Sequence, residues 1–270
     1  MLNTKEEIEK WLNKYEVENF VINDDLTVDV NGDVSLYSKL IKQFPFKFGV
    51  IIGSFYCFNN YLESLKNSPD KVNGNFNCSY NNLTSLEHCS QIIGGDLDCS
   101  KNNLTSLEYC PEVINGDFNC SKNNLTSLEH CPEVIHGSFD CFNNNLTSLE
   151  GCTEAINGSF NCSNNNLTSL EYCPQKVSGS FNCAFNDLTS LKHCPEKIYD
   201  ELDFFCNKID KKLLYLFSSD VKGDIVSDFG DKEKFLFEVK KQKSLKEKKE
   251  LNKVISLPEN NNSELTKKRL

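Results

Sequence analysis

The sequence lacks the two kinds of segment that direct a protein into or across a membrane. It starts Met1-Leu2-Asn3-Thr4-Lys5, with no basic start followed by an apolar core, so we expect no signal peptide. No apolar run approaches the roughly 20 residues needed to cross a bilayer. We therefore expect a cytoplasmic protein with no membrane partner, in a compartment that keeps thiols reduced.

The sequence also lacks any group of residues that suggests catalysis. It contains no glycine-rich phosphate-binding loop and no recognisable set of nucleophile, base and orienting residue. Three of the four histidines share one place in a repeat with two tyrosines, which favours a surface position over a catalytic one. These residues are His88, Tyr109, His130, Tyr172 and His193. We therefore expect no enzyme, no catalytic residue, no cofactor and no small-molecule substrate.

Positive charge is scarce over most of the chain, whose formal net charge is -10 at pH 7. Residues 231–270 hold 12 Lys or Arg and 7 Asp or Glu, whereas residues 1–230 hold 17 and 32. The body is therefore acidic and the C-terminal segment is basic. Because an acidic body is not built to neutralise phosphates, nucleic acid is not an expected partner.

Cysteine, in contrast, is abundant and regularly placed. Thirteen of the 14 cysteines follow steps of 21 residues in two series, Cys57 to Cys183 and Cys89 to Cys194, and Cys206 falls outside both. Zinc sites require close pairs such as Cys-x₂-Cys, so we expect no metal site. Disulfides are a second possibility, but the side chains of an in-register ladder point the same way, which is poor geometry for bridging. We interpret the cysteines as small, reduced core residues.

Other residue types keep the same step. In Gly116-Asp117-Phe118-Asn119-Cys120-Ser121, apolar and polar residues alternate, which predicts a half-buried strand with Phe118 and Cys120 inward and Asp117, Asn119 and Ser121 outward. Two leucines three residues apart follow the strand, and an isoleucine or valine column closes each unit. We expect the glycine at the strand entry to permit a positive φ or a close backbone approach. An asparagine recurs three residues after each cysteine of the first series: Asn60, Asn81, Asn102, Asn123, Asn144, Asn165 and Asn186.

The run Phe118-x-Cys120-x-x-Asn123-x-Leu125-x-x-Leu128 resembles the leucine-rich-repeat signature, and seven units in residues 53–199 carry it. Its 21-residue length and its Leu-x-x-Cys-Pro ending are similar to short repeats of bacterial, phage and large-DNA-virus proteins. A viral origin would place the protein in the host cytoplasm. The resemblance implies a right-handed solenoid with a parallel sheet on its concave face and short extended or 3₁₀ segments on its convex face. It also implies an inward asparagine ladder that satisfies backbone groups at the bend.

The pattern divides the chain into four parts. We expect residues 1–31 to form an N-terminal cap, with a helix over 4–15 that begins at a capping box and two short strands near 20–22 and 26–30. Residues 32–217 should form the solenoid of about nine units, closed by the apolar residues at 213–217. Residues 218–239 follow as a C-terminal cap region. The lysine-rich residues 240–270 are predicted to be a basic tail, a solvated helix that passes into disorder.

The outward strand positions predict a binding surface. They carry acidic and amide side chains, and aromatic residues interrupt this stripe. Phe142 is the most informative aromatic, because its column otherwise holds serine at positions such as Ser100, Ser121 and Ser163. Strand propensity alone is the alternative reason for aromatics here. The predicted partner-binding residues are Tyr56, Phe58, Tyr80, Asp96, Asp98, Asp117, Asp140, Phe142, Phe185 and Phe205.

We therefore expect a non-enzymatic scaffold for protein–protein interaction that uses the exposed strand face, with a protein as its partner. A second possibility is a recruiter or adaptor subunit for a host enzyme such as a ubiquitin ligase. Only about 50 residues follow the predicted cap, with no cysteine after Cys206, so such a protein would carry no ligase domain of its own. A third possibility is a structural or ice-binding solenoid, based on the Thr-Ser ladder from Thr84-Ser85 to Thr189-Ser190.

Overall fold

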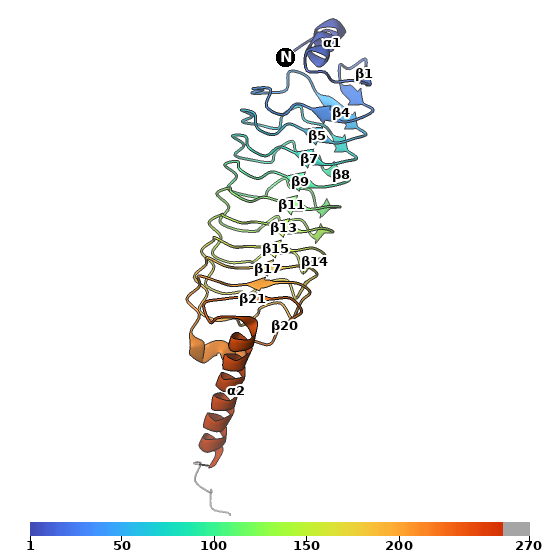
Figure 1. Ribbon diagram of the computed structural model, residues 1–270. Helices are drawn as coiled ribbons and strands as arrows, with labels where there is room; N and C mark the ends of the chain where they lie inside the picture. The colour runs from blue at the N-terminus through green and yellow to red at the C-terminus, as the bar shows by residue number, and fades with distance from the viewer. Residues whose placement is uncertain (256–270) are drawn as a thin grey trace, which may run out of the picture.

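The computed structural model describes residues 1–255 and is a parallel β-solenoid whose coils stack along one axis (Figure 1). Each repeat coil contributes two short strands, and strands of successive coils pair in parallel. Phe118 pairs with Phe139, and Ile135 pairs with Ile156, so the register reproduces the 21-residue step. Ten strands form the longer sheet, which corresponds to about nine turns. The predicted repeat solenoid is thus confirmed.

The strands lie on two sides of the coil. The longer sheet contains β3 (Val34–Ser35), β5 (Phe55–Tyr56), β7 (Phe76–Asn77), β9 (Leu97–Asp98), β11 (Phe118–Asn119), β13 (Phe139–Asp140), β15 (Phe160–Asn161), β17 (Phe181–Asn182), β19 (Leu202–Asp203) and β21 (Ile225–Val226). The second side contains β1 (Phe20–Ile22), β2 (Val28–Val30), β4 (Phe48–Ile51), β6 (Lys71–Val72) and β8 (Ile92–Ile93), then β10 (Val113–Ile114), β12 (Val134–Ile135), β14 (Ala155–Ile156), β16 (Lys176–Val177), β18 (Lys197–Ile198) and β20 (Asp220–Val221).

The predicted apolar columns form the core. Phe118, Cys120, Leu125, Leu128 and Ile135 are all buried, and their equivalents in the neighbouring coils are buried too. Where neighbouring coils both carry phenylalanine the rings stack, with centroids 5.3 Å apart between β11 and β13 and planes inclined by 8°, and Leu97 of β9 continues the apolar column between Phe76 and Phe118. Stacking at the coil spacing lets each ring bury both faces, so an unbroken apolar column runs through the solenoid.

One outward position was predicted wrongly. Ser121 is buried, and so are Ser100 and Ser163 in the same column. The Ser121 hydroxyl donates a hydrogen bond of 2.7 Å to Asn119 Oδ1, so it turns back onto its own strand. Alternation predicts exposure at this place, but the chain has already begun to bend there.

The glycine at the strand entry is required by a close approach in the coils from Gly53 to Gly179. The φ of Gly116 lies outside the left-handed region, yet a Cβ atom added to it would clash with Asp96 Oδ1 and with the backbone nitrogen of Asp96. The same Asp96 oxygen accepts a hydrogen bond from the next residue, Asp117 N. Of the two reasons predicted for glycine here, the close approach therefore applies.

The asparagine ladder lies inside the bend as predicted. Asn123 Nδ2 donates to the carbonyl oxygens of Cys120 and of Cys99 in the preceding coil, at 3.0 and 3.1 Å. Its Oδ1 accepts a hydrogen bond of 3.0 Å from Leu104 N. One side chain thus satisfies buried backbone groups of two coils. Asn207, one 21-residue step beyond the predicted series, makes the same kinds of contact.

The N-terminal end is covered by helix α1 (Lys5–Lys14), which lies within the predicted range 4–15. Thr4 Oγ1 accepts a hydrogen bond from Glu7 N, which satisfies a backbone donor at the start of the helix. Ile8 and Leu12 are buried against the first coils. The antiparallel pair β1–β2 then leads into the parallel stack through β4.

The C-terminal end differs from the prediction. The solenoid does not close at residue 217, because β20 and β21 follow the 3₁₀ helix η1 (Lys211–Leu216) and add further strands to both sides. Leu202 pairs with Ile225, a step of 23 residues, so a search at the 21-residue period misses this coil.

The helix expected at the start of the basic tail begins earlier in the chain than predicted. Residues 240–255 belong to helix α2 (Lys232–Ile255), which begins inside the predicted cap region and projects beyond the last coil (Figure 1). Phe235 and Val239 of α2 are buried, so packing on the last coil anchors the helix. Residues 256–270 lie outside the described residues. None of the helices within residues 1–255 is both long and apolar enough to pass through a bilayer.

Candidate binding surface

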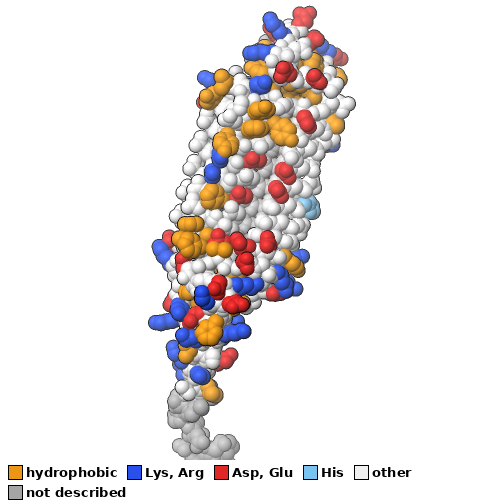
Figure 2. Space-filling model, viewed as in Figure 1, with side chains coloured by type: hydrophobic (Ala, Val, Ile, Leu, Met, Phe, Trp, Pro, Cys, Tyr) orange, Lys and Arg blue, Asp and Glu red, His pale blue; other side chains and the backbone are white. Residues whose placement is uncertain are grey.

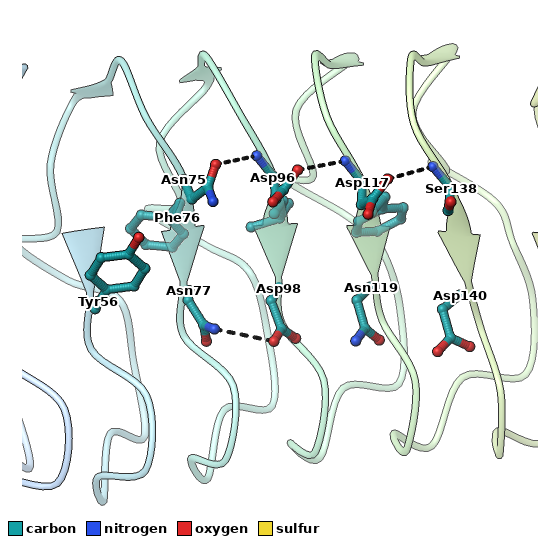
Figure 3. Close-up of a pocket in the computed structure, with 12 residues that line it drawn as sticks. Tyr56, Asn75, Phe76, Asn77, Asp96, Asp98, Asp117, Asn119, Ser138 and Asp140 are labelled. Atoms are coloured by element: carbon teal, nitrogen blue, oxygen red, sulfur yellow. Dashed lines mark hydrogen bonds between the residues drawn. The ribbon is translucent and has the colours of Figure 1, made fainter. Parts of the chain in front are cut away.

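A shallow groove of about 390 Å³ runs over the outer face of the longer sheet, from β5 to β13 (Figure 3). Its floor is made by outward side chains that alternate with the buried phenylalanine and cysteine columns. They form two rows along the solenoid, one at the strand entry and one on the strands. The entry row is Asn75, Asp96, Asp117 and Ser138, and the strand row is Tyr56, Asn77, Asp98, Asn119 and Asp140.

The side chains of the entry row form a hydrogen-bonded chain across the coils. Asn75 Oδ1 accepts from Asp96 N at 2.9 Å, Asp96 Oδ1 accepts from Asp117 N at 2.8 Å, and Asp117 Oδ1 accepts from Ser138 N at 2.7 Å. Each side chain is therefore fixed by the next coil. Sequence reasoning missed this role, although only Asp, Asn or Ser, all hydrogen-bond acceptors, occupies the position after the column glycine throughout this row.

The strand row is fixed by bonds within each coil. Asp98 Oδ1 accepts from Ser100 N at 3.0 Å, and Asp140 Oδ1 accepts from Phe142 N at 2.9 Å. Asn77 Nδ2 also donates to Asp98 Oδ2 at 3.2 Å, which connects two coils. Aspartate and asparagine suit this place equally, because either can accept a bond from the backbone two residues on. An aspartate in this row is thus not required by the fold.

Four carboxyl groups share the groove, and no lysine or arginine is among its lining residues. Burial raises the pKa of Asp140, and the neighbouring Asp98 carboxylate acts in the same direction. The bond from Phe142 N and the charge of Lys122 oppose that shift. A cationic group that entered the groove would relieve the repulsion between carboxylates, so the groove favours positively charged ligands.

Of the predicted aromatic residues, Tyr56 alone lines the groove. Phe58, two residues further on, stacks against Tyr37 with centroids 5.2 Å apart and planes at 8°. Tyr80 is 48% exposed and lies under Lys101 Nζ, 3.6 Å from the ring centroid. These contacts make a partly apolar rim beside the N-terminal half of the groove.

The other predicted aromatics lie further along the solenoid. The Phe142 ring is partly buried, with Lys122 Nζ 5.6 Å from its centroid, and Phe142 follows the groove residue Asp140 by two positions. Phe185 and Phe205 meet edge to face with centroids 5.9 Å apart, in the coils of β17 and β19. The structure therefore brings together Tyr56 and the four aspartates, places Phe58, Tyr80 and Phe142 near one long edge, and leaves Phe185 and Phe205 as a separate pair.

Sequence reasoning did not identify the two lysines at the rim, Lys101 and Lys122. They occupy the same column as Tyr80, directly after the buried serine that lies two residues past each strand, and all three have a left-handed backbone with φ between 52° and 55°. The sharp bend aims their side chains back over the neighbouring aromatic rings. The bend therefore places two positive charges on the rim beside the negatively charged groove. The 21-residue pattern alone does not reveal this placement.

Within residues 1–255, no three His, Cys, Asp or Glu side chains converge in a way that could hold a metal ion. His88, His130 and His193 are exposed, which agrees with the predicted surface position. In comparisons with known proteins, no family model, no curated protein and no solved structure matches the chain. The parallel pairing of successive coils defines the fold as a parallel β-solenoid.

Proposed function

We propose that this protein is a non-enzymatic scaffold that binds a protein partner on the outer face of its longer sheet. The observation that carries the proposal is the convergence of Asp96, Asp98, Asp117 and Asp140 in one groove without a basic residue among the lining side chains. The expected ligand is a segment rich in lysine or arginine, whose apolar side chains would contact Tyr56 and the rim at Tyr80 and Phe142.

We further infer that the coils are leucine-rich repeats of the short type, with the longer sheet on the concave face. The inward asparagine ladder and the two buried leucines that follow it support this inference. A cytoplasmic location is part of the same proposal, because 14 unpaired cysteines suit a reducing compartment.

The proposal is tested by selection from a library of random displayed peptides on the immobilised protein at low ionic strength. Peptides rich in lysine and arginine should be enriched. Their affinity should fall by about tenfold or more in a double variant, Asp98→Asn with Asp140→Asn, because each substitution removes a charge and keeps the backbone acceptor.

A matched control changes two exposed carboxylates on the second side of the coil, Glu133→Gln with Glu154→Gln. This variant loses the same formal charge and should bind the selected peptides like the wild type. Equal loss in both variants would show that only the overall charge matters. A selection that yields no basic peptides would reject the groove as the binding surface.

A further inference from the structure

The part of α2 beyond the last coil is an exposed surface of unusual composition. Every residue from 243 to 253 is exposed, and seven lysines and two glutamates lie between residues 240 and 253. Figure 2 shows the basic side chains gathered at this end of the molecule, whereas acidic side chains are spread over the coils. The molecule is therefore electrically polarised along its long axis.

One face of α2 combines apolar and basic side chains. Phe237, Leu245 and Leu251 are 69%, 43% and 59% exposed. At about 100° per residue these three residues, Lys241 and Lys248 fall within an arc of about 120°, which begins beside the packed face at Leu245 and ends opposite it at Leu251. Nothing within residues 1–255 covers this side, so three large apolar side chains remain in contact with solvent.

The dimensions of this helix fit the groove. The stretch from residue 240 to 253 is about 20 Å long at 1.5 Å per residue. The groove crosses five strands, and four intervals of about 4.8 Å make about 19 Å. Lys241 and Lys248 are about 10 Å apart along the helix, which is close to the spacing of Asp98 and Asp140, two coils apart.

We propose that the projecting part of α2 docks lengthwise on the groove of a second copy of this chain, so that copies join head to tail. The proposal deepens the proposed function, because it names an occupant for the same groove. Lys241 and Lys248 pair with the groove carboxylates, and Leu245 and Leu251 contact Tyr56 and the rim aromatics. Since the helix and the groove are different surfaces, every added copy still offers one of each, and the assembly stays open.

The test uses full-length protein and sedimentation velocity at low ionic strength. A helix variant carries Lys241→Glu with Lys248→Glu, and the groove variant carries Asp98→Asn with Asp140→Asn. A control carries Lys42→Glu with Lys192→Glu, two exposed lysines in other parts of the molecule. Wild type and control should grow in mass with protein concentration, and physiological salt should weaken association by about tenfold.

Mixing the variants gives the decisive measurement. The helix variant and the groove variant should each remain monomeric, yet a mixture should form a 1:1 complex, because one keeps an intact groove and the other an intact helix. A wild type that stays monomeric at millimolar concentration, or variants that fail to pair on mixing, would overturn the proposal. If the wild type stays monomeric but basic peptides still bind the groove, the proposed function stands and only the self-association falls.

Discussion

At the scale of single residues, the asparagine at each bend holds backbone groups of two coils together. Asn144 accepts a hydrogen bond of 3.0 Å from Leu125 N and donates two, to the carbonyl oxygens of Cys120 and Cys141. All three groups lie inside the solenoid, where unpaired polar atoms are costly. The next residue, Asn145, is exposed.

Asn144→Ala should therefore lower the free energy of unfolding by roughly 1–3 kcal/mol, because three backbone groups lose their partner. Asn145→Ala is the matched control and should change it by less than about 0.5 kcal/mol. Chemical denaturation of the three proteins measures both values. Equal stability of the two variants would mean that water or a local shift replaces the lost bonds.

Asp140 is a residue whose charge works against the fold. Because burial raises its pKa above that of the unfolded chain, ionisation of Asp140 costs stability. The cost is absent below the unfolded pKa of about 3.9 and fully present once the pH exceeds the raised folded value. Asp140→Asn, which keeps the acceptor for Phe142 N, should therefore stabilise the protein at pH 7.

That gain should shrink as the pH falls toward 4, where the wild-type carboxyl is protonated. Thermal melts of wild type and Asp140→Asn across this range measure the difference. The Glu133→Gln variant provides a comparison at an exposed site. A difference that grows on acidification would show that the ionised form of Asp140 is the favoured one in the fold.

Substitution of Phe142 should affect binding without affecting stability. In the equivalent position, Ser121 donates a hydrogen bond to Asn119 Oδ1, so serine fits the strand end well. Phe142→Ser should change the free energy of unfolding by no more than about 0.5 kcal/mol. It should weaken binding of the selected basic peptides by about 2 kcal/mol if the ring is a contact anchor. Unchanged affinity in the folded variant would remove Phe142 from the binding surface.

At the scale of elements, the coil is predictable and its ends are not. Alternation predicts that Phe118 and Cys120 face inward, because a strand has a period of two. It does not predict that Asp96 accepts a bond from Asp117 N, since that contact depends on how two coils are placed. The candidate site shows the same limit: exposed aspartates follow from the pattern, but their convergence with Tyr56, and the separation of Phe185 from them, follow from the stack.

The last coil shows most clearly why the ends of the solenoid could not be predicted from the sequence. Its strands repeat after 23 residues because η1 lengthens the bend. The 21-residue sequence pattern therefore ends one coil before the stack of coils does. Helix α2 is lysine-rich throughout its projecting part, which resembles a solvated tail in composition. Phe235 and Val239 nevertheless anchor it, and two buried side chains are too few for composition to reveal.

Helix α2 should accordingly divide into a part that stabilises the protein and a part that does not. Phe235 packs against Phe204 and Phe217, with centroids 5.2 and 5.1 Å away, so Phe235→Ala should cost about 3–5 kcal/mol. Phe237→Ala, two residues further on and 69% exposed, should cost less than about 0.5 kcal/mol. Denaturation midpoints of the two variants check this. A similar loss in both would mean that the outer face of α2 packs against another part of the chain.

At the scale of the whole molecule, the two cysteine series form a continuous part of the core, so thiol reactivity reports on the integrity of all the coils. Burial raises the pKa of Cys89 and Cys194 to about 12. A thiol reacts as the thiolate, so at pH 8 these groups are slow both because few are ionised and because reagents cannot reach them. Cys206 is exposed and outside the ladder, and although partial burial and the charges of Asp228 and Asp203 raise its pKa too, reagents can reach it.

Thiol titration of the native protein at pH 8 should therefore find one rapidly reacting group, and titration in denaturant should find all 14. The native reaction should disappear in Cys206→Ser, which serves as the control. Cys110, Cys131 and Cys152 are partly exposed and should be the next to react, well after Cys206. Because each coil contacts mainly its neighbours, opening of one end would release thiols coil by coil, whereas a cooperative stack releases them together. Rapid reaction of several thiols under native conditions, or fewer than 14 in denaturant without reductant, would show that the ladder is open or partly oxidised.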